Sequence, residues 1–149
     1  MEVISNYGNQ ISLNIPEKLS RFNAGKYENY GQKGENDMKV IEMKSSPEKP
    51  NPHNVSVRML YDTEHAQAVH IELKPGEALK KHVTPVDVFF YVLEGKGVVE
   101  IGDETQEVSR DMLIESPAKL PHRLLNPGDG IFRVLVVKAP RQTEPTRLL

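Results

Sequence analysis

The sequence predicts an all-β sandwich or barrel, and three observations favour this fold class. From Asn54 onward, short apolar runs recur every eight to twelve residues, a spacing typical of antiparallel strands joined by tight turns. Glycine or proline stands in each break between these runs, where a strand cannot continue. After residue 55, no window keeps the apolar spacing of three and four that an amphipathic helix requires.

Each strand is expected where apolar and β-branched residues gather between two such breaks. The breaks are KPGEA, LEGKG, IGDET, SPAKLP and NPGDG. The expected strands, in chain order, are NVSVRMLYD (54–62), AQAVHIEL (66–73), VDVFFYVL (86–93), GVVEI (97–101), TQEVS (105–109), DMLIES (111–116) and IFRVLVVKAP (131–140). The final segment, RQTEPTRLL (141–149), is a polar tail that either lies across a neighbouring surface or is loose.

Residues 1–54 are polar and punctuated by glycine and proline, so we interpret them as an arm and linker ahead of a barrel over residues 55–140. Apolar residues alternate with polar ones in one part of the arm, which is typical of a short β-hairpin. These apolar residues are Ile11, Leu13 and Ile15. The alternative is that Met38 rather than Met1 is the true start, in which case the preceding residues lie outside the real domain.

Composition excludes several classes of function. The chain has 149 residues, enough for one domain with its own core. It has no cysteine, which excludes disulfides, thiolate nucleophiles and cysteine-ligated metal centres. The net charge of −2, with both signs interspersed, argues against a nucleic-acid partner. No apolar run approaches a membrane span of about 20 residues, and the opening residues lack a signal-peptide core, so we expect a cytoplasmic protein without a membrane partner.

Two motifs connect the chain to a known family. Gly76 is followed after five residues by His82, and FFYVLEGKG closes this first motif. Further along, SPAKLPHRLLN places His122 after a proline-containing turn and ahead of Asn126. In this order and separation, residues 55–140 resemble the cupin superfamily, in particular its small single-domain barrels. The resemblance implies a jelly-roll barrel, also called a double-stranded β-helix, with a cavity at one end and assembly as a homodimer.

The resemblance also implies a metal site, but only in part. In metal-binding cupins the ligands are two histidines and a glutamate of the first motif and a histidine of the second. Two of these are present here, His82 and His122, while Thr84 and Val88 replace the others. Asp87 has the opposite strand parity, and it becomes a third ligand only if the preceding turn delays the regular strand by one residue. The expected cofactor is therefore one divalent transition metal (zinc, nickel, iron or manganese) in a reduced site, or none.

Strand alternation predicts the lining of the pocket. Thr84, Val88 and Phe90 are expected to face inward, with Thr84 as a polar group in a mainly apolar pocket. Asn126, in the second motif, is expected near the pocket in a structural more than a chemical role. Basic residues flank the two histidines and either bring positive charge to the pocket mouth or keep strand edges solvated. They are Lys80, Lys81, Lys119 and Arg123.

The sequence indicates the other three histidines less strongly as site residues. His70 alternates with Val69 and Ile71, so it points away from the core if those residues point into it; lining the cavity is the alternative. His53 and His65 lie among linker and turn residues, and both are expected to be exposed.

Three functions remain open, because the fold alone supports each of them. The first is a barrel that binds a small molecule in a pocket centred on His82 and His122. The second is a metal-dependent cupin enzyme of dioxygenase, isomerase or decarboxylase type. The third is a structural dimer whose site has decayed. The missing ligands favour the first over the second, and the two remaining histidines argue against the third, but no catalytic residue or substrate can be named.

Overall fold

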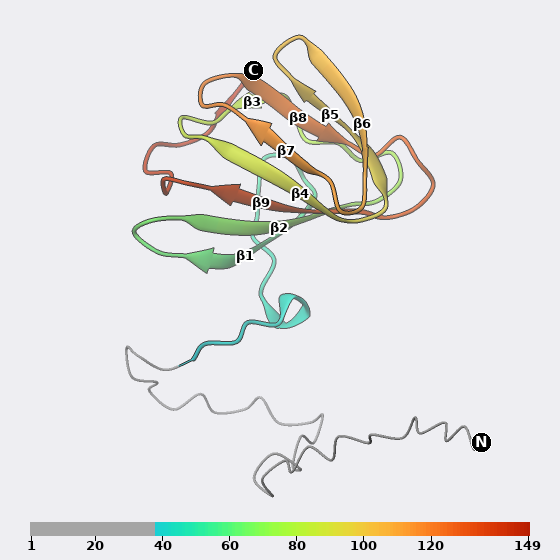
Figure 1. The fold of residues 1–149 in the computed structure, drawn as a ribbon. Coiled ribbons are helices and arrows are strands. Elements are labelled where there is room, and N and C mark those ends of the chain that lie inside the picture. The colour runs from blue at the N-terminus through green and yellow to red at the C-terminus, as the bar shows by residue number, and fades with distance from the viewer. Residues whose placement is uncertain (1–37) are drawn as a thin grey trace, which may run out of the picture. The chain divides into compact units, whose positions relative to one another are not determined.

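The computed structural model describes residues 38–149, which form two antiparallel β-sheets and no α-helix (Figure 1). The first sheet has the strand order β1-β2-β9-β4-β7 and the second has the order β10-β3-β8-β5-β6. The strands are β1 (Ser56–Asp62), β2 (Gln67–Leu73), β3 (His82–Val83), β4 (Val88–Glu94), β5 (Lys96–Ile101), β6 (Glu104–Ser109), β7 (Leu113–Ser116), β8 (Pro121–Leu125), β9 (Phe132–Lys138) and β10 (Arg147–Leu148).

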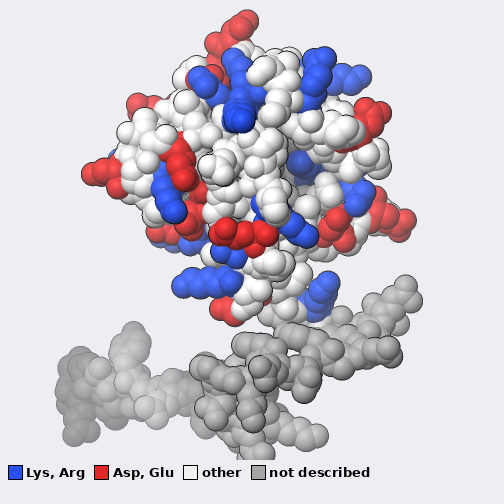
Figure 2. Space-filling view, turned by 180° about the vertical axis from the view of Figure 1, so that it is seen from behind, with Lys and Arg blue, Asp and Glu red and all other residues white. Residues whose placement is uncertain are grey.

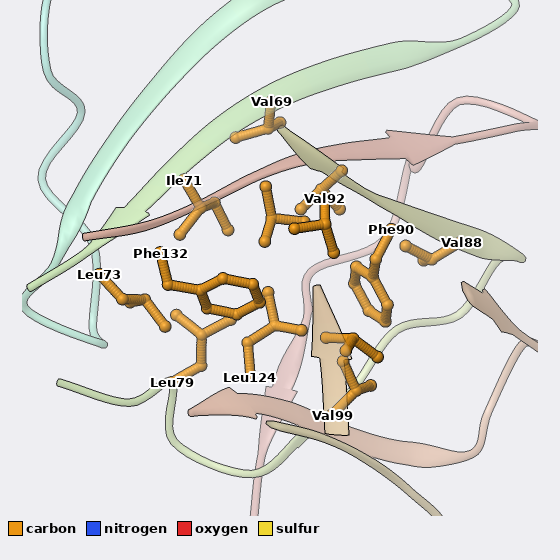
Figure 3. Close-up of a cluster of buried hydrophobic side chains, with 13 residues drawn as sticks. Val69, Ile71, Leu73, Leu79, Val88, Phe90, Val92, Val99, Leu124 and Phe132 are labelled. Atoms are coloured by element: carbon orange, nitrogen blue, oxygen red, sulfur yellow. The ribbon is translucent and has the colours of Figure 1, made fainter. Parts of the chain in front are cut away.

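The core contains side chains from both sheets (Figure 3). On β4 and β9 buried residues alternate with partly exposed ones, because successive side chains of a strand point to opposite faces. Phe132 is fully buried, and its ring lies so close to Gly97 that a Cβ there would be 2.3 Å from the ring. The inward positions of β9 are those with the parity of Phe132, which include Val134 and Val136.

The jelly-roll expectation is confirmed, and all seven expected strands are present with small changes at their ends. Three further strands lie in segments without a clear strand pattern. Two of them, β3 and β10, have only two residues each. The third, β8, begins at Pro121 inside a segment that its prolines mark as a break. Proline is tolerated as the first residue of a strand, so the break ends at Leu120, one residue before its expected end at Pro121.

Part of the expected linker belongs to the barrel. A short 3₁₀ helix spans Met43–Ser45, after which Glu48 pairs with Arg58 of β1 through both a β-bridge and a 2.8 Å ion pair. Residues 40–149 form one compact unit, so the barrel unit begins before the expected boundary at residue 55. The hairpin expected around Ile11 and Ile15 lies outside the described residues.

The C-terminal tail lies on the barrel rather than being loose. Arg147 and Leu148 pair with Val83 and His82 of β3, and the N–H of Leu149 donates to the carbonyl of Lys81 over 3.0 Å. The tail therefore adds an edge strand to the second sheet beside one of the two motif histidines.

Charges of both signs are interspersed over the face of the molecule shown in Figure 2. Among the described residues, no helix has the length and apolar character needed to cross a membrane.

Candidate functional site

One cavity contains both motif histidines. It has a volume of about 270 Å³. Apolar side chains of β1, β2, β4 and β9 make up much of its wall, among them Met59, Val69, Ile71, Val88, Phe90 and Val136. The polar groups are His53, His82, Thr84, His122, Lys138 and Thr146, with Lys49 and Asn51 from the segment before β1. The cavity is therefore mainly apolar, with several nitrogen-bearing groups, and none of the described residues brings a carboxylate to its wall.

Strand pairing brings the two motif histidines together. β3 and β8 are antiparallel neighbours, and their register places His82 directly opposite His122. The two Nε2 atoms are 3.1 Å apart, and the rings meet edge to face with centroids 4.5 Å apart. Both residues are buried. Forty residues of sequence therefore separate two imidazoles that are in direct contact.

The hydrogen bonds around this pair define which nitrogens carry a hydrogen. His82 Nδ1 is 2.8 Å from the carbonyl of Lys80, which can only accept, so Nδ1 donates and Nε2 has the lone pair. His122 Nε2 must then donate to His82 Nε2. On its other side, His122 Nδ1 accepts from the hydroxyl of Ser116 at 2.8 Å. A single chain of hydrogen bonds thus runs from Ser116 through both rings to Lys80.

Thr84 lies beside this chain, with its Oγ1 3.3 Å from His122 Nε2. Thr84, Val88 and Phe90 all line the cavity, where strand alternation places them. The Phe90 ring meets His122 edge to face at 5.4 Å.

His53 also lines the cavity, which corrects the expectation that it is exposed. Its ring centroid is 4.8 Å from that of His82, and its Nδ1 accepts from the N–H of Lys80 at 3.1 Å. His53 precedes the first strand and belongs to no motif, so no periodicity in the sequence indicates its position. His65, in contrast, is exposed as expected, with 84% of its side chain accessible.

Burial makes the imidazoles weak bases. It is the main cause that lowers the pKa of His122 to about 3, and His82 and Lys138 lower it further by charge repulsion. Burial likewise lowers the pKa of His53 to about 4 and that of His82 below its ordinary value. At neutral pH all three rings are therefore uncharged.

Lys138 supplies positive charge to this wall, and the sequence interpretation missed it. It ends β9 with the inward parity of Phe132, Val134 and Val136, and this parity is the signal that could have identified it. Burial lowers its pKa from the ordinary value for lysine. The basic residues expected near the pocket mouth do not line the cavity. Two of them, Lys81 and Arg123, instead pair with Glu100 on β5.

The donor set does not complete a metal site. Among residues 38–149, no group of three or more histidine, aspartate or glutamate side chains could hold a metal ion, whereas catalytic zinc sites generally use three protein ligands. Asp87 does not join His82 and His122: its carboxylate accepts from the N–H of Ala118 at 2.8 Å, and it lines a different cavity with Glu115. The expectation of Asp87 as third ligand is therefore wrong for this structure.

Two further residues lie away from the cavity. Asn126 was expected among the pocket residues. Its side chain is instead buried and donates hydrogen bonds to the carbonyls of Leu73 and Gly130. His70 is buried although it points away from the core, and its Nε2 accepts from Arg133 at 3.0 Å. Its alternative placement in the cavity wall is thus not the one observed.

Comparison with known proteins places this arrangement in a family. The cupin domain family matches residues 69–138. The tetracenomycin polyketide synthase protein TcmJ of Streptomyces glaucescens is 34% identical over 77 residues, which cover 51% of this chain and 52% of that protein. The chain thus spans about half the length of this curated relative.

Solved structures agree on the fold. TT1209 from Thermus thermophilus is 31% identical with a TM-score of 0.61, and the match covers 70% of this chain and 99% of that one. The polyketide cyclase RemF from Streptomyces resistomycificus has a TM-score of 0.67 over 76% of this chain and 86% of its own, and at 22% identity this likeness shows the fold alone. A double-stranded β-helix, both family motifs and a matching family profile lead to one conclusion: the chain belongs to the cupin superfamily.

Proposed function

We propose that this cupin binds a compact small molecule in the cavity walled by His82 and His122. The observation that carries the proposal is the cavity itself, whose wall is mainly apolar with a few polar groups, as is typical of ligand sites. An apolar cavity of about 150 Å³ can hold benzene. A volume of about 270 Å³ therefore suits one substituted ring or a branched chain of similar size.

The histidine pair orients the ligand in this proposal. Because both rings are neutral, His82 and His122 offer a lone pair and an N–H rather than charge. A hydroxyl or carbonyl group of the ligand competes for the 3.1 Å bond between their Nε2 atoms. The name of TcmJ associates a similar protein with polyketides, so ring compounds bearing hydroxyl or carbonyl groups are the first class to test.

A metal-dependent cupin enzyme is the second candidate. The spacing of the two Nε2 atoms favours it, since two ligands at about 2.1 Å from one ion lie about 3 Å apart when they are at right angles. The incomplete donor set counts against it, because at least one donor beyond the described side chains would be needed.

Binding is tested by filling the cavity. Val136 lines the cavity and Val137, the next residue of β9, does not. Val136→Phe should abolish calorimetric binding of ring compounds such as phenol and benzoate, whereas Val137→Phe should retain the binding of the wild-type protein. If the wild-type protein binds none of a panel of single-ring compounds at millimolar concentration, the proposal fails.

The metal alternative is tested by elemental mass spectrometry of untagged protein. We expect well below one transition-metal ion per chain, and no change in the His82→Ala, His122→Ala double variant. Near-stoichiometric metal that is lost in the double variant would replace the first proposal by the second.

A further inference from the structure

Two lysines line the cavity, and Lys138 is the one that is partly buried, whereas Lys49 is exposed. Within the described part of the chain, residues 38–149, neither aspartate nor glutamate lines the cavity. Across residues 38–149, Lys138 takes part in none of the ion pairs. Its Nζ donates to the neutral amide oxygen of Gln142 at 2.5 Å. A partly buried ammonium group held only by a neutral acceptor is less stable than one that an anion joins.

The surroundings of Lys138 make an anion the suitable partner. The three histidines that face this region, His53, His82 and His122, are neutral at physiological pH and cannot balance the charge. Lys49, the other lysine of the wall, has the same sign of charge as Lys138 and cannot balance it either. A neutral histidine can still donate a hydrogen bond. His53 uses its Nδ1 to accept from the N–H of Lys80, so in the neutral ring its Nε2 carries the hydrogen. The cavity wall thus combines two lysines, the partly buried Lys138 and the exposed Lys49, with additional N–H groups and apolar side chains.

We propose that the ligand of this cavity is a monocarboxylate with a compact apolar body, and that Lys138 pairs with its carboxylate. This inference rests on the proposed function and names its ligand class. The ammonium group of Lys138 can pair with one carboxylate, whereas the apolar walls formed by residues such as Val69, Ile71 and Phe90 match the rest of the molecule. Charge-assisted hydrogen bonds in a partly desolvated site are the stronger ones, so the carboxylate contributes to affinity as well as orientation.

The C-terminal tail takes part in this arrangement. Gln142, which accepts from Lys138, donates in turn to Thr146 Oγ1 at 3.0 Å, and Thr146 lines the cavity together with Leu148. The amide of Gln142 therefore links the ammonium group to the segment that covers the cavity. When a carboxylate pairs with Lys138, this neutral partner remains available to hold the ammonium group in position.

The first test compares benzoate with benzamide, which share a ring but differ in charge. Isothermal titration calorimetry of the full chain should show benzoate binding at least about tenfold more tightly at pH 7, a difference typical of one desolvated charge pair. The preference should shrink as salt is raised. Equal affinities for the two compounds would overturn the inference while leaving small-molecule binding intact, whereas binding of neither by the wild-type chain would count against the proposed function as well.

The second test uses Lys138→Met, which keeps the length of the side chain and removes its charge. We expect this variant to lose the preference for benzoate and to retain benzamide binding. The matched control is Lys80→Met, because Lys80 is exposed and does not line the cavity although it is two residues from His82. Retention of the full benzoate preference in Lys138→Met would overturn the inference, as would an equal loss in Lys80→Met.

Discussion

His122 links the chemistry of the cavity to the stability of the barrel. Its pKa is lowered in the folded protein from 6.5 to about 3, so below pH 6.5 the unfolded chain binds more protons than the folded one. The contribution of His122 to the free energy of unfolding is therefore fully present above the ordinary histidine pKa. It is lost as the pH falls from about 6.5 towards the pKa of His122 in the folded protein. Urea unfolding should show a clearly smaller free energy of unfolding at pH 5 than at pH 7.5.

A variant identifies the residue responsible for this loss. His122→Gln removes the titrating group, so its free energy of unfolding should fall less between pH 7.5 and pH 5 than that of the wild-type protein. His65→Gln is the control, because His65 is exposed, and it should keep the wild-type dependence. An identical pH dependence in His122→Gln and wild type would contradict this account of the histidine.

At the residue scale, the sequence predicted the site residues that belong to the two motifs, although β3 and β8, which carry the two histidines, were not predicted as strands. His82 and His122 were identified by motif spacing, and Thr84 by alternation. His53 could not be predicted, since it reaches the cavity from the segment ahead of the barrel, where no periodicity constrains it. Asn126 was expected at the pocket, but hydrogen bonds to the carbonyls of Leu73 and Gly130 hold its side chain elsewhere.

At the element scale, the packing of β5 against β9 depends on the absence of a side chain at Gly97, the second residue of β5. A Cβ at this position would lie 2.3 Å from the buried Phe132 ring. Gly97→Ala should therefore lower the free energy of unfolding by about 1 to 3 kcal/mol, the usual cost of overpacking. Gly130→Ala is the matched control, since a Cβ there meets nothing within 4 Å. Equal effects of the two substitutions in denaturant unfolding would show that the close contact is not limiting.

The edge strand β10 shields His82. Leu148 pairs with His82 and lines the cavity, so deleting residues 146–149 should admit water to the imidazole. Because burial is the main cause of its lowered pKa, the pKa of His82 should rise towards the ordinary value in an NMR titration. Arg147→Ala, which keeps the backbone pairing, should leave the pKa unchanged. No rise after the deletion would mean that the tail does not exclude water.

Strand prediction succeeded where alternation extended over five or more residues, as in β4 and β9. It missed β3 and β10, whose two residues provide no period, and β8, whose initial proline resembles a break. These three neighbouring strands form the part of the second sheet that carries both motif histidines. Their pairing depends on contacts between distant segments, which local patterns do not encode.

At the scale of the whole molecule, we propose that the chain forms a homodimer. The outer face of the first sheet is apolar where β9, β4 and β7 adjoin: Leu135, Val137 and Phe89 are only partly buried, and 53% of Leu113 is exposed. A second copy would cover this face. Sedimentation should give about twice the chain mass of 16.8 kDa.

The proposed dimer face is tested with a charge. Leu113→Glu should shift the protein to monomer, whereas Leu120→Glu, which changes another exposed leucine outside this face, should not. A wild-type chain that sediments as a monomer at micromolar concentration would rule the homodimer out.

The most direct test of the central claim is nitrogen-15 NMR of the histidine rings at pH 7, before and after addition of benzoate. We predict neutral rings in the free protein, with the hydrogen on Nδ1 of His82 and on Nε2 of His122, and shifts of both sets of signals on addition of benzoate. These shifts should be absent in Val136→Phe. Ring signals that ignore benzoate and every other single-ring compound tested would contradict the claim that this histidine pair walls a small-molecule site.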